Sequence, residues 1–374
     1  MDYLPFTRPT IDEETIQGVA EVLRSGWITS GPQVLALEQA LSTYLGGRRV
    51  RALTSATGAL EVALQACGIG PGDEVITPAL SFTATPNVVM RVGAKPVFVD
   101  VDLDTRNVSL DQVESAITPN TKAIMPVHFA GLPVDMDRLY ALAKQHGLRV
   151  IEDAAHAIGS SWRGKKIGSF GDIVSFSFHP NKNMTTIEGG ALSLPGEAEA
   201  DAVELQRFHG IRKDADGDID VVLPGGKYNL TDVAACVGIG QLRQLDAFNT
   251  KRKALAAHYF EHLQTDPPLL LPARGDDGHS WHMFAPLLPL TRLRISRKQF
   301  IQLMHGLDIG VGIHYPAMHL FTLYRKLGYK DGDFPNAERI GRETVTLPLF
   351  PGMAFADVER VCQAVSDIIV ESRS

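Results

Sequence analysis

A single lysine, Lys182, lies in the stretch "SFSFHPNKNMTTIEGG", between an apolar alternation and two adjacent glycines. A lysine amine condenses with an aldehyde to form an imine, and its pKa falls readily when the amine is desolvated. Most loop lysines, however, are simply solvated. The position just beyond a predicted strand makes Lys182 a candidate for covalent chemistry, with a solvated loop residue as the alternative.

Two carboxylates, Glu152 and Asp153, end an apolar run in the stretch "VIEDAAHAIG". A carboxylate at the end of a buried strand needs a partner, because its desolvation otherwise costs several kcal/mol. The partner is either the protonated ring nitrogen of a bound heterocycle, a helix N-terminus that the carboxylate caps, or a loop lysine or arginine. The spacing does not choose between the two carboxylates. His156, three residues beyond Asp153, is typical of a hydrogen-bonded structural histidine.

The stretch "TSATGALEVAL" predicts a strand end, a turn of small residues and a helix that begins near Thr57. The N–H groups at a helix N-terminus, with a hydroxyl beside them, can bind phosphate. The alternative is an ordinary Ser/Thr cap on a buried helix. Taken alone, the sequence favours the cap.

Together these stretches match the needs of one cofactor, pyridoxal phosphate. It requires a lysine for its aldehyde, an anion cradle for its phosphate and a carboxylate at its pyridine nitrogen. Lys182, Thr57 and one of the two carboxylates supply these groups. Ser177 ends the strand before Lys182, and Phe82 follows another predicted strand at a place suited to covering a flat ring.

The elements that must position these residues alternate between strand and helix from residue 49 to residue 194. Short apolar runs with little alternation predict strands that are covered on both faces. Strands are expected at 50–54, 74–79, 96–102, 122–129, 149–154 and 173–178, and helices at 58–67, 83–92, 110–117 and 136–147. This order predicts an α/β fold with a mostly parallel, doubly wound sheet, in which ligands bind beyond the carboxyl ends of the strands.

The pattern changes at about residue 231. Long helical stretches at 231–248 and 251–265 are followed by strand-like segments at 283–290 and 311–315 and by a closing helix near 355–370. We therefore expect a large domain over residues 1–247 and a smaller C-terminal α+β domain over residues 248–374.

The composition is that of an ordinary globular chain, with 44% apolar and 21% charged residues among 374. The net charge of −7 argues against a nucleic-acid or anionic-membrane partner. Cys67, Cys236 and Cys362 are too scattered for a disulfide framework or a metal-binding spacing, and the N-terminus has no signal-peptide pattern. We expect a cytoplasmic protein without a metal site.

The chain resembles the sugar aminotransferases of the DegT/DnrJ/EryC1/StrS family, a branch of the fold-type-I pyridoxal phosphate enzymes. The resemblance covers nearly the whole chain, with matching stretches in the same order. They are "SGWITSGPQVLALEQAL", "SATGALEVAL", "GDEVITPALSFTAT", "GAKPVFVDVD", "KAIMPVHFAG", "IEDAAHAIGS", "SFSFHPNKNMTTIEGG", "KYNLTDVAACVGIGQL" and "LPLFPGM". Within the family, "SGWITSGP" and "KYNLTD" make the chain most similar to the UDP-4-amino-4-deoxy-L-arabinose–oxoglutarate aminotransferases.

The resemblance implies a role for each candidate residue. Lys182 matches the lysine that forms the Schiff base, and Asp153 matches the acid at the pyridine nitrogen, which leaves Glu152 without that role. His156 matches a Gln or His that lies beside the ring. The other implied cofactor contacts are the phosphate ligands Thr57, Gly58 and Ser177 and the ring-stacking Phe82.

The family also implies a homodimer with shared active sites. A loop of the neighbouring subunit reaches each site, most often with an Asn–Tyr–Arg-like stretch. The corresponding residues here are Lys227, Tyr228 and Asn229. We expect Lys227 and Asn229 to contact the cofactor or the nucleotide, although the departure from the commoner sequence leaves the individual contacts open.

The implied activity is transfer of an amino group from glutamate to a keto group of a nucleotide-linked sugar, expected at C4, with release of 2-oxoglutarate. Substrate contacts are expected from Trp27, Thr29 and Gly31 and from His314 and His319 in "HYPAMH". No carboxylate adjoins these two histidines in the sequence, so substrate contacts or structural roles are favoured over a metal site.

Other activities remain as alternatives. A sugar dehydratase of the same family would carry histidine in place of Lys182, or a cysteine cluster for an iron–sulfur centre, and the sequence has neither. An aminotransferase for another small keto compound or amine would keep the same cofactor residues. A non-catalytic regulator that binds the cofactor would not need both Lys182 and Asp153.

Overall fold

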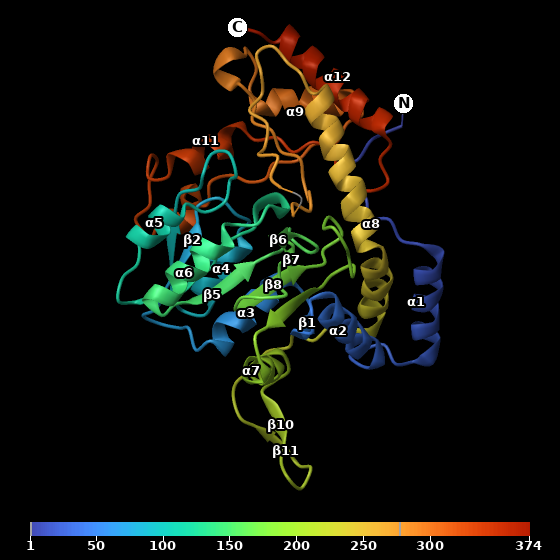
Figure 1. The fold of residues 1–374 in the computed structure, drawn as a ribbon, viewed down its shortest axis with the longest axis vertical. Coiled ribbons are helices and arrows are strands. Elements are labelled where there is room, and N and C mark those ends of the chain that lie inside the picture. Colours follow the sequence, from blue (N-terminus) through green and yellow to red (C-terminus); the bar gives the residue numbers. More distant parts are fainter. Residues whose placement is uncertain (1, 277) are drawn as a thin grey trace.

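The computed structural model describes residues 2–276 and 278–374, and its central element is a seven-stranded sheet (Figure 1). The strand order is β1 (Arg49–Leu53), β9 (Gly190–Leu194), β8 (Ile173–Ser177), β5 (Arg149–Asp153), β4 (Thr121–Ile124), β2 (Glu74–Pro78) and β3 (Lys95–Val99). From β8 to β3 all neighbours are parallel, whereas β9 pairs antiparallel with both β1 and β8. The expected mostly parallel α/β sheet is confirmed.

Helices cover both faces of the sheet because successive strand residues point to opposite sides. The helices concerned are α2 (Pro32–Tyr44), α3 (Ala56–Ala66), α4 (Ala84–Arg91), α5 (Leu110–Ser115), α6 (Met136–His146), α7 (Glu197–Arg207) and α8 (Asp232–His262). In β5, Val150 packs in the cluster that contains side chains of α2, α5, α6 and the first half of α8. Its neighbour Ile151 packs in the cluster with α3, α4 and α7.

The long helix α8 connects the two parts of the chain. Its 31 residues form one helix where we expected two. Leu245 packs in the sheet-side core, whereas Leu255 and Tyr259 pack in a second core with α9 (Arg297–Gly306) and α12 (Phe355–Glu371). The proposed domain boundary at 247/248 therefore lies inside α8, between these two cores.

The C-terminal part has fewer strands than expected. The predicted strands at 283–290 and 311–315 are reduced to isolated bridges, such as that between Phe284 and Leu347. The two prolines of the first segment have no N–H group to donate to a ladder, which limits its pairing. The remaining helices are α1 (Glu13–Ser25), α10 (Thr322–Arg325) and α11 (Pro335–Glu343).

The N-terminal segment is attached to this second core. The Leu4 N–H donates to the Asp308 carbonyl at 2.9 Å, and the Gly310 N–H donates to the Leu4 carbonyl at 2.8 Å. The side chain of Leu4 is buried in the core that α9 and α12 form. Two distant parts of the chain are thus joined.

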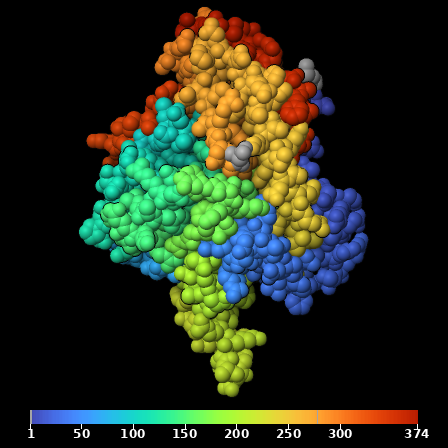
Figure 2. Space-filling view, in the orientation of Figure 1, coloured from blue at the N-terminus to red at the C-terminus, as the bar shows by residue number. Residues whose placement is uncertain are grey.

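Two short hairpins complete the described part of the chain. β6 (Ser161–Trp162) pairs with β7 (Lys165–Lys166), and β10 (Ile211–Lys213) pairs with β11 (Ile219–Val221). The second hairpin projects far from the body of the molecule (Figures 1 and 2). Its Ile219 and Val221 side chains are 70% and 61% exposed. Among the described residues, no helix has the length and apolar character needed to span a membrane.

Candidate active site

A cavity of about 230 Å³ lies at the carboxyl ends of the parallel strands. This is where a doubly wound sheet places its ligands. Its walls come from the start of α3, the segments after β2 and β5, the end of β8 with the following loop, and the segment that contains Tyr315. The predicted residues that line it are Thr57, Phe82, Asp153, His156, Ser177, Lys182 and His314.

Lys182 is partly buried in the cavity wall, on the loop after β8. Its backbone N–H donates to the His179 carbonyl at 2.8 Å, which closes a tight turn. Desolvation lowers the pKa of the Lys182 amine to about 8, and the negative charge of Asp153 opposes this decrease. An amine with this pKa gains and loses a proton near neutral pH, as a general base and acid must.

Asp153 is buried at the end of β5 and lines the same cavity. Its Oδ2 accepts a hydrogen bond from the Thr85 hydroxyl at 2.8 Å, and its Oδ1 accepts one from the Ala155 N–H at 3.2 Å. Burial raises the pKa of Asp153, although these donors and the nearby Lys182 lower it in part. The carboxylate is thus held in one orientation beside a cationic amine.

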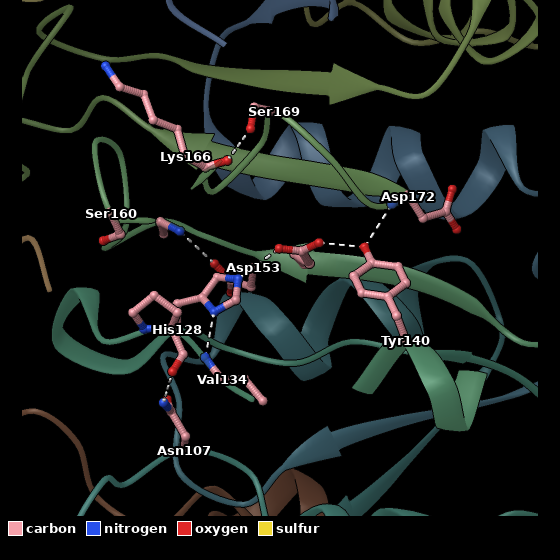
Figure 3. Close-up of polar contacts among 12 residues, drawn as sticks. Asn107, His128, Val134, Tyr140, Asp153, Ser160, Lys166, Ser169 and Asp172 are labelled. Atoms are coloured by element: carbon pink, nitrogen blue, oxygen red, sulfur yellow. Dashed lines mark hydrogen bonds and ion pairs between the residues drawn. The ribbon is translucent and has the colours of Figure 1, made fainter. Parts of the chain in front are cut away.

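Glu152 points to the other face of β5 and does not line the cavity. Its Oε1 accepts a hydrogen bond from the Tyr140 hydroxyl at 2.5 Å, and its Oε2 lies 2.8 Å from His128 Nε2. His128 Nδ1 accepts from the Val134 N–H at 3.2 Å, so Nε2 carries the hydrogen and donates to Glu152 (Figure 3). These bonds satisfy a buried carboxylate, and Glu152 has a structural role.

Tyr140 extends this network to the next strand connection. The Asp172 N–H donates to the Tyr140 hydroxyl oxygen at 2.7 Å, as Figure 3 shows. Burial is the main reason that the pKa of Tyr140 is raised, with the neighbouring Glu152 as the next cause. The hydroxyl therefore keeps its hydrogen and donates it to Glu152.

His156 lies in the cavity wall and is fixed on several sides. Its Nδ1 accepts a hydrogen bond from the Ala130 N–H at 3.3 Å, and its Nε2 lies 3.1 Å from the Tyr315 hydroxyl. The ring stacks on His282 with 4.4 Å between centroids. Desolvation, with the charge of Lys182 as a smaller cause, lowers the pKa of His156 well below its ordinary value. The ring is therefore neutral, with its hydrogen on Nε2, and donates to Tyr315.

The N-terminus of α3 forms another wall of the cavity. Ser55 caps this helix, because its hydroxyl oxygen accepts a hydrogen bond from the Gly58 N–H at 3.0 Å. Three hydroxyl-bearing residues line this part of the cavity: Ser55, Thr57 and Ser177. A side chain at position 58 would approach the Tyr228 ring to 2.9 Å, so the small residue keeps Tyr228 against the helix start. The hydroxyls and the positive end of the helix suit a phosphate.

These groups fit pyridoxal phosphate. One cavity brings together an amine of lowered pKa, a fixed buried carboxylate and a helix N-terminus with hydroxyls. They complement the aldehyde, the ring nitrogen and the phosphate of the cofactor, respectively. Phe82, which is 56% exposed at the cavity rim, offers an aromatic surface.

His314 is the one predicted substrate residue among those that line the cavity. Its Nδ1 lies 2.8 Å from the Thr346 hydroxyl, and desolvation lowers its pKa to about 4. His319 does not line the cavity, so of the two roles expected for it the structural one fits its environment. Its side chain has no exposed surface and its Nε2 lies 3.0 Å from Glu338, so it has a structural role.

The three predicted N-terminal substrate residues lie outside the cavity lining of this subunit. Trp27 is 59% exposed, and its Nε1 donates to the Ser30 carbonyl at 3.2 Å. The Gly31 N–H donates to Asp232 Oδ1 at 2.8 Å, and the Asp232 N–H donates to the Thr29 carbonyl at 3.0 Å. These bonds fasten the segment before α2 to the start of α8.

Lys227 and Asn229 are likewise not among the described residues that line the cavity. Lys227 Nζ donates to Asn229 Oδ1, and Asn229 Nδ2 donates to the Ser30 hydroxyl. The Lys227 amine lies 5.3 Å from the centre of the Phe208 ring. Both residues are thus connected to the segment that contains Trp27, rather than to Lys182 of the same subunit.

Tyr315 is one of the cavity residues that the sequence analysis did not identify. It adjoins His314, and its position next to a predicted substrate residue was the available signal. Burial raises the pKa of Tyr315, so its hydroxyl keeps its hydrogen. Because His156 donates to the Tyr315 oxygen, this hydrogen is available for another acceptor.

Comparison with known proteins relates this cavity to a family. The DegT/DnrJ/EryC1/StrS aminotransferase family model matches residues 9–366. The chain is 41% identical to the spore coat polysaccharide biosynthesis protein SpsC of Bacillus subtilis, over 98% of this chain and 97% of SpsC.

Solved structures show the same similarity. Spr1654 of Streptococcus pneumoniae, a candidate sugar aminotransferase solved in PMP and PLP forms, matches in its PMP form with a TM-score of 0.93. The identity is 33%, with 99% of this chain and 98% of Spr1654 covered. DesI, solved in the presence of its TDP-sugar product, matches with a TM-score of 0.88 and 28% identity, covering 98% of this chain and 92% of DesI.

Proposed function

Because the chain belongs to the DegT/DnrJ/EryC1/StrS aminotransferase family, we propose that it transfers an amino group from glutamate to the C4 keto group of a nucleotide-linked sugar. It is a pyridoxal phosphate-dependent aminotransferase of fold type I. The observation that carries the proposal is the cavity where Lys182, Asp153 and the N-terminus of α3 meet. The TDP-sugar product of DesI and the polysaccharide pathway of SpsC support a nucleotide sugar as the acceptor.

In this proposal each wall of the cavity holds one part of the cofactor. Lys182 binds its aldehyde and Asp153 faces its ring nitrogen, while Thr57, Gly58 and Ser177 bind its phosphate, with Phe82 and His156 against the ring. When bound, pyridoxal phosphate supplies a conjugated ring that withdraws electrons from the substrate carbon bearing the nitrogen.

The residues of this chain then perform the proton transfers. Lys182 Nζ takes the proton from the substrate carbon and returns it at the next step, which a pKa of about 8 allows near neutral pH. Asp153 keeps a negative charge at the ring nitrogen, because Thr85 and Ala155 hold its carboxylate in place. Tyr315, fixed by His156, has one hydroxyl hydrogen to donate to a polar group in the cavity.

The proposed site is completed in a homodimer. Lys227 and Asn229 are not among the described residues that line this subunit's cavity, and the nearby β10–β11 hairpin exposes Ile219 and Val221. Exposed apolar side chains on a projecting hairpin are typical of a subunit contact. We assign the loop at 227–229 and the segment at 27–31 to the partner's active site, and the protein to the cytoplasm.

The activity is tested in two half-reactions. Glutamate is first added to the purified holoenzyme, and the change in the cofactor's visible absorbance is recorded. Keto sugars linked to UDP or TDP are then added to the glutamate-treated enzyme, and products are identified by mass and by NMR of the aminated carbon. We expect the absorbance change with glutamate and amination at C4 of a nucleotide sugar.

Each outcome of this screen discriminates between functions. Lys182→Ala is the matched control, which should fold and show no turnover. Amination of a small free keto compound in preference to every nucleotide sugar, or use of a simple amine as the donor in place of glutamate, would replace the proposed substrate class. An unchanged spectrum with glutamate and with other amino donors would support a non-catalytic cofactor-binding protein.

The shared site is tested by mixing two inactive variants. Lys182→Ala keeps the 227–229 loop intact, and the double variant Lys227→Ala/Asn229→Ala keeps the lysine intact. Random exchange makes about half of the dimers mixed, each with one complete site, so about a quarter of wild-type activity should return. Absence of recovery, with subunit exchange confirmed by native mass spectrometry, would show that the loop does not complete the partner's site.

A further inference from the structure

The end of α8 and the first turns of α12 bring two histidines and a carboxylate together on the surface, away from the active-site cavity. His258 and His262 are four residues apart on α8, and Glu359 comes from α12. The two helices pack against each other in the second core (Figure 1). We propose that these three residues form a binding site for a divalent transition-metal ion of the Zn²⁺ class, which links α8 to α12.

The distances between the candidate ligand atoms suit one small ion. His258 Nε2 lies 3.0 Å from Glu359 Oε1, and one ligand atom from each of the three residues falls within 4.8 Å of the others. Bonds of about 2.0–2.2 Å from a tetrahedral zinc ion place its ligands about 3.3 Å apart. The exposed His262 side chain would have to rotate to bring the third ligand to this spacing.

The hydrogen bond of His262 leaves its Nε2 free, whereas His258 Nε2 shares a hydrogen with Glu359 Oε1, a hydrogen that a metal ion would replace. His262 Nδ1 lies 3.0 Å from the His258 carbonyl oxygen, which can only accept, so Nδ1 carries the hydrogen and Nε2 keeps its lone pair. Glu261 Oε2 lies 3.8 Å from His258 Nδ1 on the side opposite to Glu359. A carbonyl and a carboxylate behind the metal-facing nitrogens are the partners that metal-binding histidines usually have.

A simple ion pair accounts for less of this arrangement. A charged His258 paired with Glu359 explains their separation of 3.0 Å, but it does not explain a second imidazole whose centroid lies 3.9 Å away. A metal ion uses both rings and the carboxylate at once.

The ligand set selects the class of ion and the type of site. Two imidazoles and one carboxylate favour zinc, nickel or copper over magnesium or calcium, which prefer oxygen ligands. Glu359 is 55% exposed, so water can occupy the fourth position. Phe355, whose ring centre lies 4.9 Å from that of His258, bounds the site on one side, and Lys251 lies 4.3 Å from the Phe355 ring. This amine is a nearby positive charge that opposes binding.

The test uses tag-free holoenzyme titrated with Zn²⁺ in a calorimeter, in comparison with His262→Gln and Glu359→Gln. His305→Gln, which changes an exposed histidine on α9, is the matched control. We expect one saturable equivalent of Zn²⁺ per chain, an affinity at least tenfold lower in each ligand variant, and no change in the control. Zinc should also raise the Tm of the wild-type and control proteins, and much less that of the variants.

Each of three outcomes would overturn the proposal. Equal Zn²⁺ affinity in all four proteins, or an anomalous zinc signal elsewhere in soaked crystals, would show that these residues do not bind the ion. A loss of affinity in His262→Gln alone would show that the histidine pair binds zinc without linking the helices. Melting curves in EDTA test whether the variants are folded. All four proteins should have the same Tm when no metal ion is available.

Discussion

When no cofactor is attached, folding removes the charged amine of Lys182 from water, which lowers the stability of the folded chain. Replacing it should therefore stabilise the apoprotein while abolishing catalysis. Lys182→Met removes the charge and keeps an unbranched side chain of similar length. We expect the variant apoprotein to melt at a higher temperature than the wild-type apoprotein at pH 7.

The size of the gain follows from the pKa of the amine, which falls from its ordinary 10.5 to about 8 on folding. Each unit of this pKa difference corresponds to about 1.36 kcal/mol. The protonated amine therefore destabilises the fold by up to about 3 kcal/mol. Water in the open cavity screens part of this effect. With roughly 2.1 cal/mol/K of unfolding entropy for each of 374 residues, the upper value corresponds to a Tm increase of about 4 °C.

The gain should depend on pH in a defined direction. Between pH 8 and pH 10.5 the unfolded chain keeps the proton that the folded chain has released, so wild-type stability rises with pH in this window. The variant has no such dependence at this position. The Tm difference at about pH 9.5 should therefore be less than half of that at pH 7.

The assay is differential scanning calorimetry of the cofactor-free proteins at the two pH values. Lys122→Met, which changes an exposed lysine on β4, is the control and should melt like the wild type. Because Asp153 loses its cationic neighbour in Lys182→Met, adding Asp153→Asn should increase the gain further. A Tm difference that does not change with pH, or a Lys182→Met apoprotein less stable than the control, would refute the desolvated amine.

Three other substitutions separate chemistry from stability. Asp153→Asn should lower kcat by about 100-fold or more, while the Tm of its apoprotein is unchanged or higher, because burial raises the pKa of this carboxylate. Glu152→Gln should show the reverse in the same assays, with kcat close to wild type and a free energy of unfolding about 2–3 kcal/mol lower. The cause is that the hydrogen bonds from His128 and Tyr140 lose their charged acceptor. Tyr315→Phe should lower kcat about tenfold, the effect of one lost hydrogen bond of about 1.4 kcal/mol, and should also lower the Tm, because the buried His156 N–H loses its acceptor; an unchanged kcat would remove it from the site.

The strands and helices around the sheet were predictable because their apolar patterns are local. The spacing alone did not choose between Glu152 and Asp153, because adjacent strand residues face opposite sides and the local pattern does not say which side holds the cavity; only the family resemblance favoured Asp153. The packing of α3 and α4 decides it. β9 was missed because Gly190 looks like part of a turn, but a side chain there would approach the Ala56 nitrogen of α3 to 2.5 Å.

Residues from the C-terminal part were harder to place. His314, Tyr315 and His319 belong to one short stretch, but they have different environments because the stretch crosses the edge of the cavity in irregular backbone and His319 lies beyond it, in the 3-10 turn Met318–Leu320. No periodicity indicates which of them faces inward. The pairing of His258 with Glu359 could not be predicted from the sequence either. The two residues lie 101 residues apart on α8 and α12, and only the tertiary packing brings them together.

The attachment of Leu4 to the backbone at Asp308 and Gly310 has a consequence for the emerging nascent chain. The partner of Leu4 is synthesised about 300 residues later, which at roughly 5–20 residues per second leaves this segment unpaired on the ribosome for about 15–60 s. The second core also contains Ile369 of α12, so it closes only after that helix has been synthesised. The sheet-side core can form earlier, while the first residues remain accessible to ribosome-associated chaperones and proteases.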